Sequence, residues 1–449
     1  MRIIIIMACL YFISLSQLSA QITSCFYHPF IDSLIQQVDT SRISQHILNL
    51  SEANGFRSRV TFTPGNIWAA EYIKNQLENY SLLTEVKFDT FLIPNVPFPF
   101  DTIPLVNVTA TLNGNQPTSP HYIIGAHYDD SASLDPGINW STAWPTVQAP
   151  GADDNATGIA ILLEIARILA DPQNQFDNDI SIKFVAFAAE ESNPGINNLN
   201  HRGSQHYAST AFNQGEQIAG VYIIDMVGFT GTSYHHFNVV SNQSSVTLGE
   251  AILEANLLYQ IDIHTNSSPF TYATYSDHDR FWVYGYKAIL LIENAPPWND
   301  NLPWYVKNPY YHTREDKPEH INIPQVSKIA QSVLATIACL AAPHLSTIAI
   351  SEPMTLPKQV MLFPNYPNPF NATTTISYHL TVADKIEISV YNLQGEKVVE
   401  LYRGWQPAGD YKINWEARNG NEEPLPSSMY FLRLITTQQV VTQKMILLK

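Results

Sequence analysis

Residues 122–130 read YIIGAHYDD, a short apolar run that ends in a histidine and two aspartates. The segment at 156–170 has the spacing of a helix. Further strand-like runs lie at residues 84–91, 180–187, 221–224 and 287–292. Strands that alternate with helices predict an α/β domain with a mixed, largely parallel sheet flanked by helices. Because ligand sites in such sheets lie beyond the carboxyl ends of the strands, His127 and Asp129 are expected at a functional edge.

The remaining segments divide the chain into four parts. Residues 30–80 and 325–341 have apolar positions at helical spacing and complete a domain that we place at 21–344. Residues 345–361, with two prolines, indicate a linker. Short strands separated by turns then predict a small antiparallel β-sandwich at 362–449.

The first twenty residues have the composition of a secretory signal peptide. Arg2 precedes an apolar stretch, and small residues end it at Ala20. This stretch is shorter than the roughly 20 residues that a membrane-spanning helix needs. We therefore expect an exported protein with no membrane span in the mature chain.

Composition restricts the partners and the metal chemistry. The chain has 40 acidic and 24 basic residues among 449, a formal net charge of -16, which disfavours nucleic acid and anionic membranes as partners. Only three cysteines are present, and Cys9 falls in the signal segment, so a zinc site built from thiolates is excluded. Cys25 and Cys339 are either a disulfide pair or two buried thiols.

Four further segments carry groups suited to chemistry. Residues 150–158 open a helix with two aspartates, Asp225 directly follows the apolar run 221–224, and His312 lies among tyrosines. Each of these has an ordinary reading as a helix cap or a packing residue. Residues 184–191 end in the adjacent acids Glu190 and Glu191. The two carboxylates repel one another unless a cation lies between them or they have different functions. One glutamate that binds a metal beside another that moves a proton resolves that conflict.

Six strings, taken in order, resemble the co-catalytic di-zinc aminopeptidase family, whose fold the glutaminyl cyclases share. The strings are GAHYDD, PGADDNATG, FAAEE, IIDM, SDHDRF and HTRED. The resemblance covers residues 30–342 and implies two zinc ions. It places one ion on His127 and Asp225, the other on Glu191 and His312, and both on a bridging Asp154. It assigns the general base to Glu190 and the orientation of His127 to Asp129.

The sequence departs from the family at the oxyanion donor. A tyrosine that some relatives carry before the SDH string has no aligned counterpart, which leaves Tyr272 and Tyr275 as alternatives. Asp277 and His278 are expected to be structural supports, and a longer loop at 192–202 is expected beside the site. The other histidines lack metal-type spacing and are expected to be surface or packing residues: His121, His201, His206, His235, His236 and His264.

The C-terminal segment from residue 363 resembles the sorting domain of type IX secretion in Gram-negative bacteria. The matching strings are FPNYPNPFNATTTISYHL, VYNLQGEKV, MYFLRL and KMILLK. The resemblance implies export through the periplasm, contact with the secretion machinery, and release or attachment at the cell surface. An immunoglobulin-like module that binds substrate or sugar is the rival interpretation.

These observations predict a secreted zinc aminopeptidase that hydrolyses peptides at their N-terminal residue. The alternatives are a single-zinc glutaminyl cyclase and an inactive, surface-displayed binding protein. A complete set of two-metal ligands together with Glu190 favours the peptidase.

Overall fold

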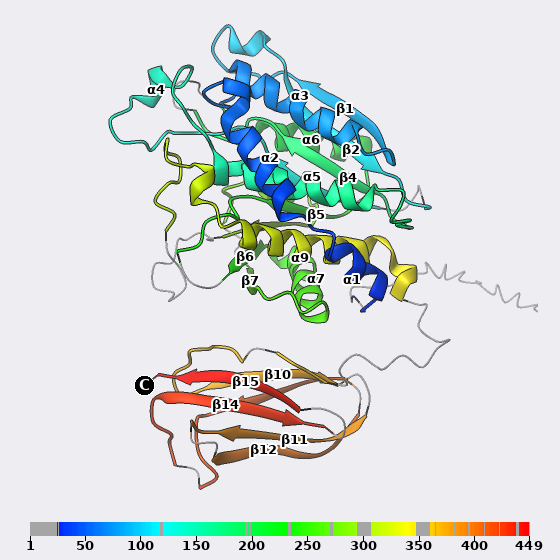
Figure 1. Ribbon diagram of the computed structural model, residues 1–449, viewed down its shortest axis with the longest axis vertical. Helices are drawn as coiled ribbons and strands as arrows, with labels where there is room; N and C mark the ends of the chain where they lie inside the picture. Colours follow the sequence, from blue (N-terminus) through cyan, green and yellow to red (C-terminus); the bar gives the residue numbers. More distant parts are fainter. Residues whose placement is uncertain are drawn as a thin grey trace, which may run out of the picture. The chain divides into compact units, whose positions relative to one another are not determined.

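The computed structural model divides the chain near residue 348 into two compact units, which are described separately (Figure 1). The predicted signal segment 1–20 and most of the linker 345–361 lie outside the described residues. The described residues are 25, 27–116, 120–193, 196, 199–231, 235–269, 273–293, 307–346, 360–363, 365–380, 383–393, 396–407, 409–421, 423–436 and 440–448.

An eight-stranded sheet forms the centre of the first unit, in the order β1-β2-β4-β3-β5-β8-β6-β7. The four neighbouring strands β4, β3, β5 and β8 are parallel, which confirms the predicted largely parallel sheet. The strand bounds are β1 Leu83–Phe91, β2 Leu105–Leu112, β3 His121–His127, β4 Ile182–Phe187, β5 Ile218–Ile224, β6 His236–Ser241, β7 His264–Pro269 and β8 Ala288–Ile292.

The central strands are buried on both faces. Along β3, Ile124 packs into one apolar cluster and Ile123 into another on the opposite face, as the two-residue repeat of a strand requires. Burial on both faces explains why these strands read as continuous apolar runs with little alternation.

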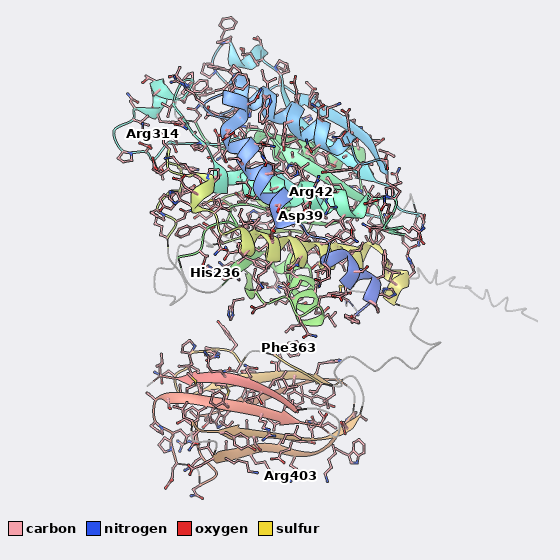
Figure 2. The ribbon with its side chains drawn as sticks, in the orientation of Figure 1. Asp39, Arg42, His236, Arg314, Phe363 and Arg403 are labelled. Carbon is pink, nitrogen blue, oxygen red and sulfur yellow. A yellow bond between two sulfur atoms is a disulfide. The ribbon has the colours of Figure 1, made fainter. Side chains whose placement is uncertain are left out.

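One face of the sheet is covered by several helices, with α2, α5 and α9 side by side across it (Figure 1). Asp39 caps α2 by accepting the backbone N–H groups of Ser41 and Arg42 (Figure 2). The bounds of the longer helices in this layer are α1 Pro29–Ile35, α2 Thr40–Glu52, α3 Pro64–Glu78, α5 Thr157–Leu169, α7 Val246–Leu258 and α9 Ile323–Ala341.

On the other face, α6 (Arg202–Gln214) and α8 (His278–Val283) pack together. Phe281 of α8 and Ala208 of α6 join the second apolar cluster beside Phe187 of β4. The first unit therefore has three layers, with the sheet between two layers of helices. A short helix, α4 (Trp140–Ala143), lies in the long connection between β3 and α5.

Helix α9 is long and apolar enough to cross a membrane by length and composition alone. In this fold 78% of the apolar 18-residue stretch of this helix is buried, and residues such as Val333 and Ile337 belong to the main core. Its composition is thus that of a core helix.

The second unit consists of two antiparallel sheets around one core, in the sandwich-like arrangement predicted from the sequence. One sheet has the order β13-β10-β9 and the other β12-β11-β14-β15. The bounds are β9 Val360–Leu362, β10 Thr374–Leu380, β11 Asp384–Tyr391, β12 Lys397–Gln406, β13 Gly409–Trp415, β14 Ser428–Ile435 and β15 Val440–Leu447.

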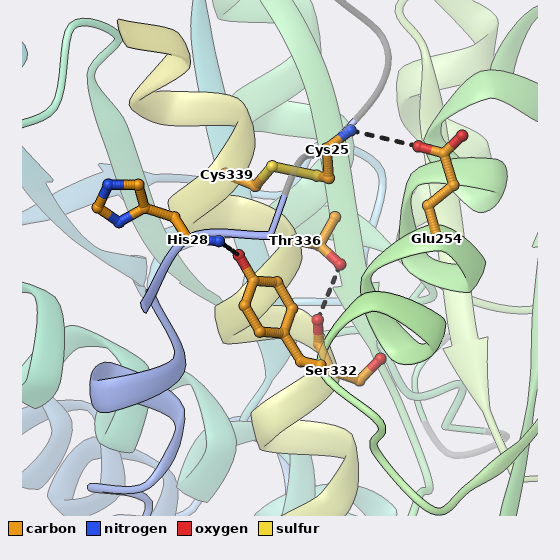
Figure 3. Close-up of a disulfide and its surroundings, with 7 residues drawn as sticks. Cys25, His28, Glu254, Ser332, Thr336 and Cys339 are labelled. Atoms are coloured by element: carbon orange, nitrogen blue, oxygen red, sulfur yellow. Dashed lines mark hydrogen bonds between the residues drawn. A yellow bond between two sulfur atoms is a disulfide. The ribbon is translucent and has the colours of Figure 1, made fainter. Parts of the chain in front are cut away.

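Cys25 and Cys339 form a disulfide that joins the segment before α1 to the last turns of α9 (Figure 3). Next to it, the backbone N–H of Cys25 donates to Glu254, and that of His28 donates to the Tyr259 hydroxyl. The N-terminal segment is therefore attached to both α9 and α7.

Loss of this disulfide is expected to lower the stability of the first unit. The bond closes a loop with a sequence separation of 314, so its removal should lower the free energy of unfolding by about 3–5 kcal/mol. Guanidinium denaturation of the Cys25→Ser/Cys339→Ser variant and of the parent chain measures this difference. Reductant should produce the same loss in the parent chain and none in the variant; equal stability of the two chains would contradict the expectation.

Candidate metal centre

The predicted site residues meet at the carboxyl edge of the parallel strands. His127 ends β3, Asp225 directly follows β5, and Glu190 and Glu191 come shortly after β4. Asp154 lies in the turn that leads into α5. Neighbouring parallel strands thus bring together groups that are 98 residues apart in the sequence.

The side chains form two groups, each with three oxygen or nitrogen atoms within 4.8 Å of one another. In the first, His127 Nε2 lies 3.2 Å from Asp225 Oδ1 and 3.2 Å from Asp154 Oδ1. In the second, His312 Nε2 lies 2.9 Å from Glu191 Oε1 and 3.1 Å from Asp154 Oδ2. The two oxygens of Asp154 face different groups, so this carboxylate lies between them.

The electrostatics of the site indicate a deficit of positive charge. Burial would lower the pKa of His127, but Asp225 and Glu190 outweigh it and raise the pKa well above its usual 6.5. Burial also raises the pKa of Glu191 well above 4.5, with His312 opposing and Asp154 adding to the shift. Crowded buried carboxylates of this kind are stabilised by cations.

The donor set fits zinc. Each group offers imidazole nitrogen and carboxylate oxygen, the borderline and hard ligands that zinc accepts, and no thiolate is needed. The second ring nitrogen of His312, Nδ1, lies 3.2 Å from the Ser133 hydroxyl, which orients the ring. Such partners on the second nitrogen direct the first toward a metal.

Asp129 is fully buried beneath both glutamates. Its carboxylate accepts the backbone N–H groups of Glu190 and Glu191, each at 3.1 Å, and the Thr61 hydroxyl at 2.9 Å. His127 Nδ1 is closer to the backbone oxygen of Asp129, at 3.2 Å, than to the carboxylate oxygen, at 3.6 Å. The partner of His127 Nδ1 is therefore the backbone oxygen of Asp129, and the Asp129 carboxylate holds the turn that carries the glutamates.

A second carboxylate, Asp316, supports the turn at Asp154. It accepts the backbone N–H groups of Asp153 at 2.9 Å and Asp154 at 3.1 Å. Asp316 closes the HTRED string, so its place in that motif was the only sequence signal. Arg314 of the same segment pairs with Asp135 at 3.1 Å (Figure 2).

The two tyrosines named as possible oxyanion donors are not brought to the site by the described residues. Tyr272 lies outside the described residues, and Tyr275 is 58% exposed. Tyr311, which the sequence did not single out, stacks on His312 with ring centroids 3.8 Å apart. Burial raises the pKa of Tyr311, and the negative charges of Glu191 and Asp154 add to the shift. The phenol is therefore close enough to the site to interact electrostatically with its carboxylates.

His201 also differs from expectation, because it is not a surface or remote packing residue. It is 3% exposed, and its Nε2 lies 2.9 Å from Glu190 Oε1. Asp277 and His278 are buried where α8 begins. Burial and nearby Glu190 raise the pKa of Asp277 to about 8, and burial lowers that of His278 to about 4.

Arg59 is a buried cation that links the loops leading to the site. Its guanidinium donates to the backbone oxygens of Leu50, Tyr128, Pro150 and Gly151 at 2.7–2.9 Å. The backbone N–H of Arg59 also donates to Asp130 at 2.8 Å. Apolar spacing gives no signal for such a residue.

The fold and the buried histidine and carboxylate groups together define an α/β domain of the metallopeptidase class. The sequence matches Peptidase family M28 over residues 107–337, more than half of the chain. The chain belongs to peptidase family M28.

Individual relatives match shorter parts of the chain at low sequence identity. Aminopeptidase YwaD of Bacillus subtilis is 29% identical over 192 residues, which cover 42% of this chain and 37% of that protein. The chain thus spans well under half the length of this relative.

Two solved structures share the fold of the first unit, each at 19% identity. LapA of Legionella pneumophila has a TM-score of 0.57, covering 73% of this chain and 80% of that one. A glutaminyl cyclase of Porphyromonas gingivalis has a TM-score of 0.53, covering 67% and 97%. Residues 365–448 match the secretion system C-terminal sorting domain.

Replacement of Arg59 by Met is expected to destabilise the first unit. The change leaves four backbone oxygens without a buried donor and Asp130 without its cation, at a cost of about 3–5 kcal/mol. Thermal denaturation at fixed zinc measures the effect. Arg57→Met is the control, because Arg57 is exposed and donates to one backbone oxygen. Equal melting temperatures for both variants would refute the role of Arg59.

Proposed function

We propose that the chain is an exported zinc aminopeptidase with two metal ions per site. His127 and Asp225 would hold one ion, Glu191 and His312 the other, and Asp154 both. The observation that carries the proposal is the position of Asp154, whose two carboxylate oxygens lie 3.2 and 3.1 Å from histidines of different groups. A carboxylate shared in this way suits a pair of metals.

Zinc bound at such a site supplies Lewis-acid activation of a peptide carbonyl and of water. Glu190 contributes the general base, because it is adjacent to Glu191 but outside both metal-binding groups. Burial raises the pKa of Glu190 above its usual 4.5, although His201 and His127 oppose the shift. Its carboxylate accepts a proton from the attacking water and returns that proton to the departing amine.

Tyr311 is the residue that we assign to the oxyanion. Its ring is fixed by stacking on His312, and its phenol is protonated at all ordinary pH values because burial and the site carboxylates raise its pKa. A protonated phenol can donate a hydrogen bond to the carbonyl oxygen as negative charge develops there. We therefore assign the oxyanion to Tyr311 in preference to Tyr275, which is 58% exposed, while Tyr272 lies outside the described residues.

The first metal-binding group favours hydrolysis over cyclisation. A single-zinc cyclase needs one group, whereas His127 and Asp225 form a second set of ligands with Asp154. The likeness to aminopeptidase YwaD points in the same direction. An inactive binding protein would have no need to retain Glu190 beside five ligands.

Export is assigned to the C-terminal unit. The match of residues 365–448 to a secretion sorting domain supports recognition by the type IX machinery and delivery across the outer membrane to the surface or the medium. The disulfide between Cys25 and Cys339 suits an oxidising compartment outside the cytoplasm.

Replacement of Glu190 by Gln is expected to remove catalysis and keep zinc. The amide cannot accept the proton, so kcat on aminoacyl amides should fall by about 10²- to 10⁴-fold. Turnover on a panel of aminoacyl amides and N-terminal glutaminyl peptides, with elemental analysis of zinc, measures both effects.

The matched control is Glu250→Gln, an exposed glutamate on α7 that is outside the site. It should retain the parent kcat and zinc content. Unchanged turnover in Glu190→Gln would remove Glu190 from the mechanism, and pyroglutamate formation with one zinc per chain would favour the cyclase.

A further inference from the structure

His201 contacts Glu190 through both its backbone and its side chain. The backbone N–H of His201 donates to the backbone oxygen of Glu190 at 2.9 Å, and Nε2 lies 2.9 Å from Glu190 Oε1. His201 is 3% exposed and Glu190 is 6% exposed, so water competes little with this contact. The imidazole is therefore placed to hold one oxygen of the Glu190 carboxylate.

The other side of the imidazole faces a second acid. His201 Nδ1 lies 3.4 Å from Asp279 Oδ1, and Asp279 is in turn paired with Arg280. Asp279 belongs to the SDHDRF string, in which the mechanism gives it no role. Glu190, His201 and Asp279 thus form a line of carboxylate, imidazole and carboxylate, which we call the Glu190 support.

The local backbone explains how His201 reaches this position. The backbone N–H groups of Arg202 and Gly203 donate to the oxygens of Ala189 and Ala188, which anchors the start of α6 along the turn after β4. His201 itself has a left-handed conformation, with φ of 47°. The long loop from residue 192 ends at this histidine, with Asn193 and Leu199 also buried.

We propose that His201 is a positioning residue for the general base. Its Nε2–H bond to Glu190 Oε1 holds the carboxylate so that Oε2 accepts the proton from water. The carboxylate of Asp279, an ion-pair partner 3.4 Å from Nδ1, favours the ring orientation that makes this bond. The kinetic effect of His201 rests on the proposed function. The hydrogen bond between His201 and Glu190 does not depend on that function.

The charges around the imidazole agree with this arrangement. Burial would lower the pKa of His201, but Glu190 and Asp279 outweigh it and raise the pKa to about 10. Asp277 adds to the shift, and His278 is the further titratable group that faces His201 from α8. The imidazole is therefore protonated at neutral pH: Nε2 donates to Glu190, and Nδ1 lies at ion-pair distance from Asp279, 3.4 Å away, without a hydrogen bond to it.

The kinetic test compares two replacements of His201 in the full-length, zinc-loaded chain. His201→Leu removes the donor, and kcat should fall by about 10- to 100-fold with KM within about twofold and zinc unchanged. His201→Gln retains an N–H donor at a similar distance and should restore kcat to within about fivefold of the parent. This rescue would not follow if His201 only filled space.

His206→Leu is the matched control. His206 lies on the same helix, and its Nε2 contacts Asp89 Oδ1 at 3.0 Å, a histidine and carboxylate pair outside the metal site. It should leave kcat unchanged. The proposal is overturned by a parent kcat in His201→Leu, by an equal loss in His206→Leu, by loss of zinc with kcat, or by a glutamine variant as slow as the leucine variant.

A spectroscopic measurement separates this proposal from the proposed function. In the chain labelled with ¹⁵N-histidine, the His201 signals are identified by their absence in His201→Gln. The Nε2 signal should shift in Glu190→Gln and stay unchanged in Glu250→Gln, whether or not the parent hydrolyses any peptide. An unshifted signal overturns the Glu190 support, whereas a shifted signal in a chain without peptidase activity contradicts only the proposed function.

Discussion

Crowding of negative charge at one edge of the sheet is the constraint on which the rest of the structure depends. Asp154, Glu190, Glu191 and Asp225 are all buried, and the histidines among them cannot balance four carboxylates. Desolvated like charges are costly unless a cation lies between them. The two histidine-containing groups, with Asp154 between them, give two places where bound cations would meet this requirement. As metal ligands, the proposed role, the carboxylates would no longer oppose the fold.

The surrounding layers hold these groups in place through backbone contacts. Asp129 binds the N–H groups of the two glutamates, Asp316 binds those of the turn at Asp154, and Arg59 links the loops on either side. Each contact fixes a main-chain segment, from which a ligand then projects. His201 is different because its side chain contacts Glu190, the proposed general base. Hydrogen bonds thus hold both the segments that carry the proposed ligands and the proposed general base Glu190.

Much of this arrangement could be predicted from the sequence. Continuous apolar runs such as 122–125 predicted the buried parallel strands, and the order of six strings predicted the residues that meet at the edge. Strand β2 was missed although Leu105–Leu112 is rich in β-branched residues, and β6 and β7 were missed because their polar residues hide the pattern. The positions of His201 and Tyr311 at the site could not be predicted. His201 reaches Glu190 because the loop after β4 folds back against it, and Tyr311 stacks on His312; residue spacing in the sequence indicates neither contact.

The central claim is that the two groups around Asp154 each bind zinc. Anomalous X-ray diffraction at the zinc absorption edge, from crystals of the full-length chain prepared with zinc, tests it most directly. The account predicts two peaks, one among His127, Asp154 and Asp225 and the other among Asp154, Glu191 and His312. No peak, a single peak at one group, or peaks only at other residues would contradict it.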